Sequence, residues 1–139
     1  MLYSEYLTTL DECPFCARRN KVILDDEEAY LTYAIAPYHQ HHLLIIPKRH
    51  TESVQDLSPA ERGSVLRLEH RALDALKKLG YRKISLLVRE GESDLRTVAH
   101  VHYHVIPEVN IHMAEHVPER AVLTLEEIDA TIRDISAQM

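Results

Sequence analysis

Alternating and continuously apolar segments along the chain predict four strands. AYLTYAIA at 29–36 is the first segment with a clear period of two, which is typical of a strand. HLLII at 42–46 is continuously apolar up to Pro47, as expected of a strand that is covered on both faces. ISLLV at 84–88 has the same character, and the histidine-containing segment at 99–106 predicts a further strand.

The strongest helical signal follows the second of these strands. Ser58 is a candidate N-cap, Pro59 suits the first helical position and Glu61 completes a capping box. Gly80 is well placed to end the helix. The apolar residues at helical spacing between these limits are Val65, Leu68, Ala72, Leu76 and Leu79.

A second capping box, Thr124 with Glu127, predicts a helix near the C-terminus. Its expected inward residues are Leu125, Ile128, Ile132 and Ile135. The order of elements predicts an α+β fold: a mostly antiparallel sheet with one long helix after the second strand and a C-terminal helix. No internal repeat, low-complexity tract or linker divides the chain, so we expect a single domain over residues 1–139.

Composition and charge narrow the class of protein. The chain is 45% hydrophobic and 27% charged, and its longest aliphatic run is far shorter than the roughly 20 residues of a membrane span. The N-terminal residues lack the features of a secretory signal, so we expect a cytoplasmic protein. The formal charge of −6 argues against non-specific binding of nucleic acid, although it leaves room for a local basic pocket.

Three histidines alternate with apolar residues in AHVHYHVIP at 99–107. On a strand that rises about 3.3 Å per residue, His100, His102 and His104 would share one face, each roughly 6–7 Å from the next. Mutual repulsion and partial burial would keep most of these rings neutral at neutral pH, because both lower the pKa of an imidazole. A neutral imidazole is both a metal ligand and a nucleophile. The alternative is a row of polar residues on a solvent-facing strand.

Both cysteines of the chain lie in CPFC, as Cys13 and Cys16. Tetrahedral zinc commonly takes such a Cys-x2-Cys pair together with two ligands from a distant segment. His50, which follows a strand end, and one of the strand histidines are candidates for the other two ligands. Two reduced and buried thiols are the alternative.

A further group of histidines lies in YHQHH at 38–42, in a loop before a strand. These histidines could bind a metal. They could also form the edge of a phosphate site, because imidazoles and loop amides both donate hydrogen bonds to anionic oxygens. For His42 we favour the phosphate site. His39 and His41 have no assigned role, nor do His112 and His116 in the loop after the histidine segment.

Three motifs together resemble the histidine triad (HIT) superfamily of nucleotide hydrolases and transferases, and its zinc-binding Cys-x2-Cys subgroup. They are HVHYHVIP at 100–107, HLLIIPKRH at 42–50 and CPFC at 13–16. The resemblance covers roughly residues 13–107. It implies a HIT-like fold and a homodimer with the long helix and a sheet edge at the interface. It also implies a covalent mechanism in which the middle histidine attacks the α-phosphorus of a nucleotide.

The resemblance implies a role for each matching residue. His102 would be the nucleophile, His104 would contact the phosphate or leaving group, Thr97 would hydrogen-bond there, and His42 would lie on the phosphate side. Four residues would bind a structural zinc ion, and four more would contact the base and the phosphate. These are Cys13, Cys16, His50 and His100 for zinc, Phe15, Tyr33 and Ile35 for the base, and Arg96 for phosphate. With His100 on zinc, a backbone carbonyl would have to orient the His102 ring.

Several positions depart from the family pattern around the ribose and phosphates. Alanine stands where an acidic residue usually binds ribose (Ala34, Ala36), Leu95-Arg96 replaces Gly-Gln, Arg89 replaces asparagine, and Glu108 replaces arginine. Arg89 and Arg96 would suit contacts to additional phosphates; the alternative is that both are solvated loop residues.

These features predict an enzyme that acts on the α-phosphate of a nucleotide phosphoramidate, a nucleotide anhydride or a dinucleoside polyphosphate. One alternative is a non-catalytic, zinc-containing nucleotide-binding protein, which the missing ribose acid favours. Another is a nucleotidyltransferase to a sugar phosphate. Val101, Tyr103 and His104 disfavour it, because that related group carries a proline and a glutamine around its active histidines.

Overall fold

The computed structural model describes residues 1–92, 98–109 and 120–139. Its helices and strands, in chain order, are α1 (Tyr3–Thr8), β1 (Leu24–Asp25), β2 (Ala29–Tyr33), β3 (Leu43–Pro47), the 3-10 turn η1 (Val54–Asp56), α2 (Pro59–Lys78), β4 (Ile84–Val88), β5 (Tyr103–Pro107) and α3 (Leu125–Ser136). No helix among these is long and apolar enough to cross a membrane.

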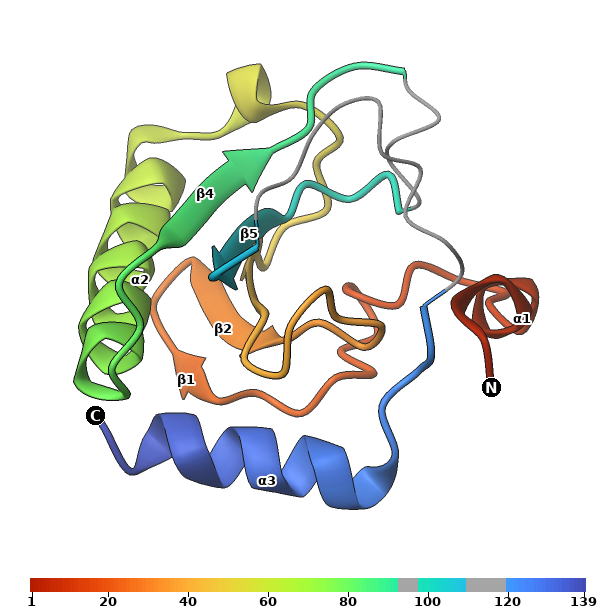
Figure 1. The fold of residues 1–139 in the computed structure, drawn as a ribbon. Coiled ribbons are helices and arrows are strands. Elements are labelled where there is room, and N and C mark those ends of the chain that lie inside the picture. Colours follow the sequence, from red (N-terminus) through yellow and green to blue (C-terminus); the bar gives the residue numbers. More distant parts are fainter. Residues whose placement is uncertain (93–97, 110–119) are drawn as a thin grey trace.

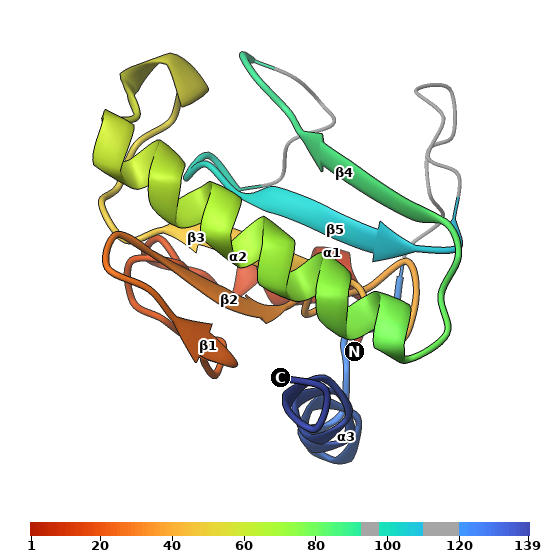
Figure 2. The ribbon, with the colours of Figure 1, turned by 90° about the vertical axis from the view of Figure 1, so that its left-hand side faces the viewer.

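The strands form one sheet in the order β1-β2-β3-β5-β4, and every neighbouring pair is antiparallel (Figure 1). Helix α2 lies across one face of this sheet, and α3 lies beside the β1–β2 end (Figure 2). The prediction of an α+β fold with a long helix after two strands and a C-terminal helix is confirmed.

Strand β3 separates two apolar clusters, because its successive side chains point to opposite faces of the sheet. Leu43 and Ile45 pack with Leu68 and other residues of α2. Leu44 and Ile46 pack on the opposite face, in a cluster with Phe15 from the loop after α1. This two-sided burial explains why β3 is continuously apolar in sequence.

The ends of α2 follow the sequence signals. The Ser58 hydroxyl accepts a hydrogen bond from the Glu61 amide at 3.1 Å, and the Glu61 carboxylate accepts one from the Ser58 amide at 2.8 Å. Two amides that the first helical turn would leave without partners are thereby satisfied. The helix ends at Lys78, and Gly80 leaves it with a φ of +101°, which glycine adopts without steric cost.

The strand predicted over 99–106 is wrong in extent, since β5 begins only at Tyr103. In the register of β3 with β5, Ile45 lies opposite Tyr103, so Pro47 would lie opposite Val101. Proline has no amide hydrogen to continue the ladder, and the Val101 amide instead donates to the Thr51 carbonyl at 2.8 Å. His100 and His102 therefore precede the strand, and only His104 lies within it.

Two smaller expectations also fail. Strand β2 ends at Tyr33 rather than at Ala36. In α3, Ile128 and Ile135 are buried as expected, but Leu125 in the first turn is 74% exposed.

Candidate functional site

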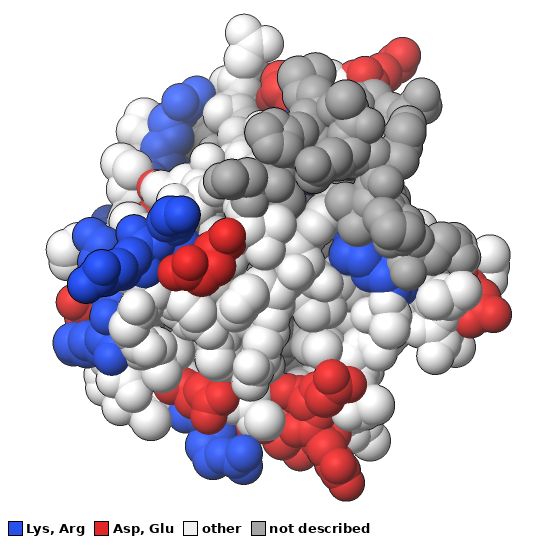
Figure 3. Space-filling model, viewed as in Figure 1, with Lys and Arg blue, Asp and Glu red and all other residues white. Residues whose placement is uncertain are grey.

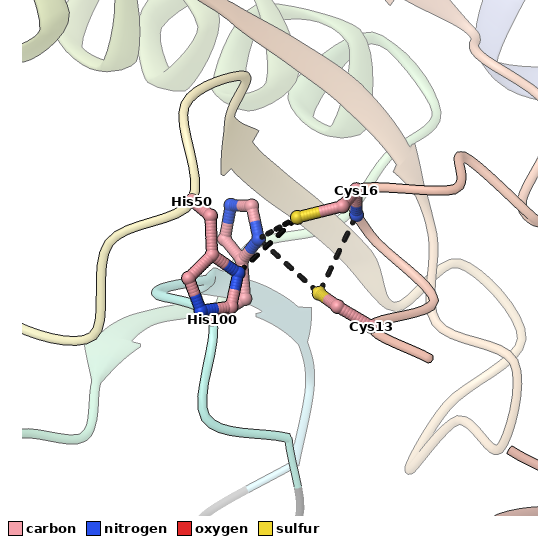
Figure 4. A group of neighbouring side chains, drawn as sticks. All are labelled: Cys13, Cys16, His50 and His100. Carbon is pink, nitrogen blue, oxygen red and sulfur yellow. Dashed lines mark hydrogen bonds between the residues drawn. The ribbon is translucent and has the colours of Figure 1, made fainter. Parts of the chain in front are cut away.

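Cys13, Cys16, His50 and His100 come together from three separate segments of the chain (Figure 4). Their candidate ligand atoms all lie within 4.8 Å of one another. The Cys16 sulfur lies 3.1 Å from His50 Nδ1 and 3.4 Å from His100 Nδ1. A tetrahedral zinc ion would hold nitrogen and sulfur ligands about 3.5 Å apart, so these residues fit a zinc ion with two thiol and two imidazole ligands.

The two imidazoles are fixed through their outer nitrogens. His100 Nε2 donates to the Pro47 carbonyl at 2.8 Å, and His50 Nε2 donates to the Glu52 carboxylate at 3.1 Å. A proton on Nε2 leaves the lone pair of each ring on Nδ1, the atom that faces the sulfurs. Such outer hydrogen bonds are typical of histidines that bind a metal.

The two thiols differ in how readily they ionise. Burial opposes ionisation of Cys13, but the backbone amides of Cys16 and Phe15 point at its sulfur and hold its pKa below the ordinary value. Burial, together with the neighbouring Cys13, raises the pKa of Cys16 to about 11. The second thiol would ionise at neutral pH only with a positive charge beside it, which a divalent cation would supply.

His42 and His104 form a buried pair on the sheet face opposite α2. His104 lies opposite Leu44 in the register and therefore points to the same side as Leu44. His42 Nε2 lies 3.0 Å from His104 Nδ1, and the two residues are 2% and 9% exposed. Burial lowers the pKa of His42 to about 3 and also lowers that of His104 well below its ordinary value. Both rings are therefore neutral at neutral pH.

His102 is half-buried and lies between the metal-site cluster and the His42–His104 pair. Its Nδ1 donates to the His100 carbonyl at 2.8 Å, so its lone pair is on Nε2. The ring centroid is 4.9 Å from that of His104 and 5.1 Å from that of Phe15. The prediction that a backbone carbonyl orients this ring is confirmed.

Two arginines lie near the histidine pair. Arg89 follows β4, and its Nη1 is 3.4 Å from His104 Nε2. Arg120 donates to the Ala36 carbonyl at 2.6 Å and stacks on Tyr38, 4.0 Å from the ring centroid. No motif marks Arg120 in the sequence, and its neighbours in the fold are distant along the chain, so this residue was not predicted.

The other predicted substrate residues are dispersed. Phe15 contacts His100 and His102 by its ring edge. Tyr33 has the strand parity of Leu31, which points toward α2, and its hydroxyl accepts a hydrogen bond from the Lys21 amide. Ile35 is half-buried just after β2. The structure therefore does not bring Tyr33 and Phe15 to one face of the sheet. Thr97 and Arg96 lie outside the described residues.

The remaining histidines divide by position. His41 is buried and bridges the Tyr81 hydroxyl and the Asp134 carboxylate, which ties the loop before β3 to α3. His39 packs its ring against Tyr81, with centroids 5.2 Å apart. This arrangement indicates a structural role for His41. His112 and His116 lie outside the described residues.

Charge is unevenly spread over the face seen in Figure 1. Basic residues gather on the side where α2 lies and acidic residues at the end where α3 lies (Figure 3). Between these two groups, much of the described surface on this face is without charged side chains (Figure 3).

Comparisons with known proteins identify the family of this chain. The HIT domain family matches residues 17–111, and the chain belongs to this family. An uncharacterised HIT-like protein of Methanocaldococcus jannaschii is 30% identical over 100 residues, which cover 68% of this chain and 78% of that protein. An adenosine 5'-monophosphoramidase of Schizosaccharomyces pombe is 33% identical over 76 residues, 55% of each chain.

Solved structures share the fold. A HIT-like protein of Bartonella henselae has a TM-score of 0.76 at 19% identity, with 91% of this chain and 92% of that chain covered. A zinc-bound histidine triad protein of Mycobacterium smegmatis has a TM-score of 0.68 at 24% identity, with 95% and 96% covered. A diadenosine triphosphate hydrolase of Plasmodium falciparum has a TM-score of 0.69 at 19% identity, with 84% and 74% covered. These likenesses establish the fold alone.

Proposed function

We propose that the protein is a nucleotide hydrolase or nucleotidyltransferase in which His102 attacks the α-phosphorus of the substrate. The observation that carries this proposal is the hydrogen bond from His102 Nδ1 to the His100 carbonyl. It fixes the tautomer with its lone pair on Nε2, the form that a nucleophilic imidazole requires. Family membership and the phosphoramidase relative support the same chemistry.

The buried pair supplies one neutral hydrogen-bond donor, His104, beside this nucleophile. A neutral His104 next to His102 suits contact with a phosphate oxygen, and His42 fixes its orientation from behind. Phe15, whose ring lies against His102, suits the base or ribose side. We keep Ile35, Thr97 and Arg96 as proposals from the family resemblance, but not Tyr33, which has the strand parity of the opposite sheet face.

The metal would be structural. Zinc bound by Cys13, Cys16, His50 and His100 would have four protein ligands and no open position for substrate. The bound zinc ion would hold three segments together: the loop after α1, the loop after β3 and the segment before β5. Both thiols are free of a disulfide in the described structure, which suits our proposal of a reducing, cytoplasmic location.

We also propose a homodimer through α2 and β4. In the described part of the sheet β4 is an edge strand, and edges of this kind are usually covered. Two large apolar side chains are exposed on these elements, Leu66 at 64% and Leu86 at 44%.

The test of catalysis is turnover of adenosine phosphoramidate, ADP and diadenosine triphosphate by the purified protein, with AMP release as the readout. We expect the His102→Asn variant to lose at least about 1000-fold in kcat, because it removes the attacking lone pair but keeps a similar size. Arg133→Asn, on the exposed side of α3 and away from the proposed dimer surface, is the control and should keep full activity. Equal turnover by His102→Asn and the parent protein would exclude His102 as the nucleophile.

A non-catalytic nucleotide-binding protein is the second candidate function. Ala34 and Ala36, where the family usually has an acid for the ribose, are buried at 5% and 4% exposure and offer no hydrogen bond to a sugar. Calorimetric titration with AMP separates the two functions: binding without turnover of any of the three substrates would favour the binding protein.

A further inference from the structure

Arg89 is placed against the histidine pair by the register of β4 with β5. Leu87 lies opposite His104, and Arg89, two residues further along the same chain, has the same parity. Its side chain therefore reaches the face on which His104 lies, and Nη1 comes within 3.4 Å of His104 Nε2. The residue is half-buried rather than fully solvated.

The hydrogen bonds behind His104 determine which of its nitrogens carries a proton. The Tyr38 amide donates to His42 Nδ1 at 3.2 Å, so a neutral His42 must carry its proton on Nε2. That proton is donated to His104 Nδ1 at 3.0 Å. A neutral His104 must then carry its own proton on Nε2, the nitrogen that faces Arg89.

The contact between His104 and Arg89 therefore joins two donors. A guanidinium has five N–H groups and no acceptor, so Arg89 offers no lone pair to the His104 Nε2 proton. Two donors 3.4 Å apart are both satisfied when one oxygen lies about 2.9 Å from each nitrogen. An anionic oxygen is favoured, because Arg89 carries a full positive charge and His104 is shielded from water.

We propose that Arg89 and His104 together bind an oxygen of the phosphate that leaves, so that the enzyme prefers substrates whose α-phosphorus is joined through oxygen to a further phosphate. This inference rests on the proposed function, since it needs a nucleophile at His102. Arg89 is then a specificity-determining residue that favours phosphate leaving groups and gives no such gain to phosphoramidates, whose leaving amine brings no negative charge.

The reaction takes place in two steps and needs only the substrate and water. The Nε2 lone pair of His102 forms the bond to phosphorus, and the bond between phosphorus and the bridging oxygen breaks with its electron pair on that oxygen. The leaving phosphate departs as an anion, so no proton is required at that moment, and its added charge falls between Arg89 and the His104 N–H. Water then attacks phosphorus, gives up a proton to solvent, and the N–P electron pair returns to His102.

The experiment compares kcat/KM for ADP, diadenosine triphosphate and adenosine phosphoramidate in the parent protein, Arg89→Asn and Arg89→Lys. Loss of a charge-assisted hydrogen bond predicts that Arg89→Asn lowers kcat/KM about 10- to 100-fold for the two phosphate-leaving substrates. We expect less than about threefold change for the phosphoramidate, and partial rescue in Arg89→Lys, which keeps the charge without the fork. Arg133→Asn, on the exposed side of α3, is the matched control.

The inhibition constant of a phosphate compound supplies a second measurement, because it reports binding and not the rate of the chemical step. Inorganic pyrophosphate should inhibit the parent protein, and Arg89→Asn should raise its inhibition constant about 10-fold or more while that of AMP changes little. If Arg89→Asn affects all three substrates equally, or none of them, this proposal is overturned although the proposed function stands. If the parent protein turns over no substrate, the proposed function itself fails. Thermal unfolding of each variant checks that the fold is retained.

Discussion

The carbonyl oxygen of His100 accepts a hydrogen bond from Nδ1 of His102 at 2.8 Å, while the ring of His100 turns its own Nδ1 toward the thiols of Cys13 and Cys16. One residue therefore connects the candidate metal centre with the proposed nucleophile. The backbone that fixes the tautomer of His102 is held in place by the side chain that would bind the metal. Stability and activity should consequently both depend on this cluster.

Replacing Cys16 with serine should remove the metal and destabilise the protein, because a hydroxyl is a poor zinc ligand and the three segments of the cluster would no longer be joined. Elemental analysis should find about one zinc per chain in the parent protein and almost none in the variant. We expect the midpoint of thermal unfolding to fall by on the order of 10 °C. A Ser53→Ala variant, outside the cluster, should keep its zinc. A parent protein that is free of metal with both thiols reactive would show that the zinc assignment is incorrect.

The buried His42 should make the protein less stable in mild acid. Its pKa is held at about 3 chiefly by burial, whereas in the unfolded chain it is about 6.5. Between these values the unfolded state binds a proton that the folded state does not, so the free energy of unfolding falls as the pH is lowered. The contribution of one such histidine is about 1.4 kcal/mol per pH unit.

Denaturant unfolding between pH 7.5 and 5 measures this effect. The pH dependence should be weaker in His42→Gln than in the parent protein by about that amount, whereas Ser136→Ala at the exposed end of α3, which removes no titratable group, should leave it unchanged. Because the metal ligands are common to all three proteins, their own titration cancels in the comparison. An identical slope in His42→Gln would mean that the buried ring is charged or solvated in the folded protein.

The capping box of α2 should contribute measurably to stability. Ser58→Ala removes the acceptor for the Glu61 amide, and we expect the free energy of unfolding to fall by about 1 kcal/mol. Urea unfolding at neutral pH measures the change, and Ser136→Ala at the exposed end of α3 is the control, expected within about 0.5 kcal/mol of the parent protein. An unchanged free energy of unfolding in Ser58→Ala would mean that water satisfies the Glu61 amide as well as the serine hydroxyl does.

Short sequence patterns were sufficient to predict the parts of the fold that are determined by residues close together in the chain. The apolar run of β3 and the capping box at Ser58 each follow from a short segment, and both predictions are confirmed. The start of β5 could not be predicted in this way, because it is set by Pro47 on another strand. Similarly, motif spacing indicated Cys13, Cys16 and His50 and the family resemblance added His100, whereas the approach of Arg89 to His104 follows from strand register, which the sequence does not state.

The proposed dimer gives the last prediction. A glutamate at Leu86, in the middle of the edge strand β4, would place a charge where a partner sheet would be buried, and burial of an unpaired charge is strongly unfavourable. The parent protein should elute in size-exclusion chromatography with light scattering at about twice 16.1 kDa, and Leu86→Glu at about that single mass. Leu125→Glu is the matched control, since Leu125 is 74% exposed on α3, away from β4, and should leave the dimer intact. If Leu86→Glu dimerises as well as the parent protein, a different surface joins the two copies, because an interface through β4 would have to bury the new carboxylate.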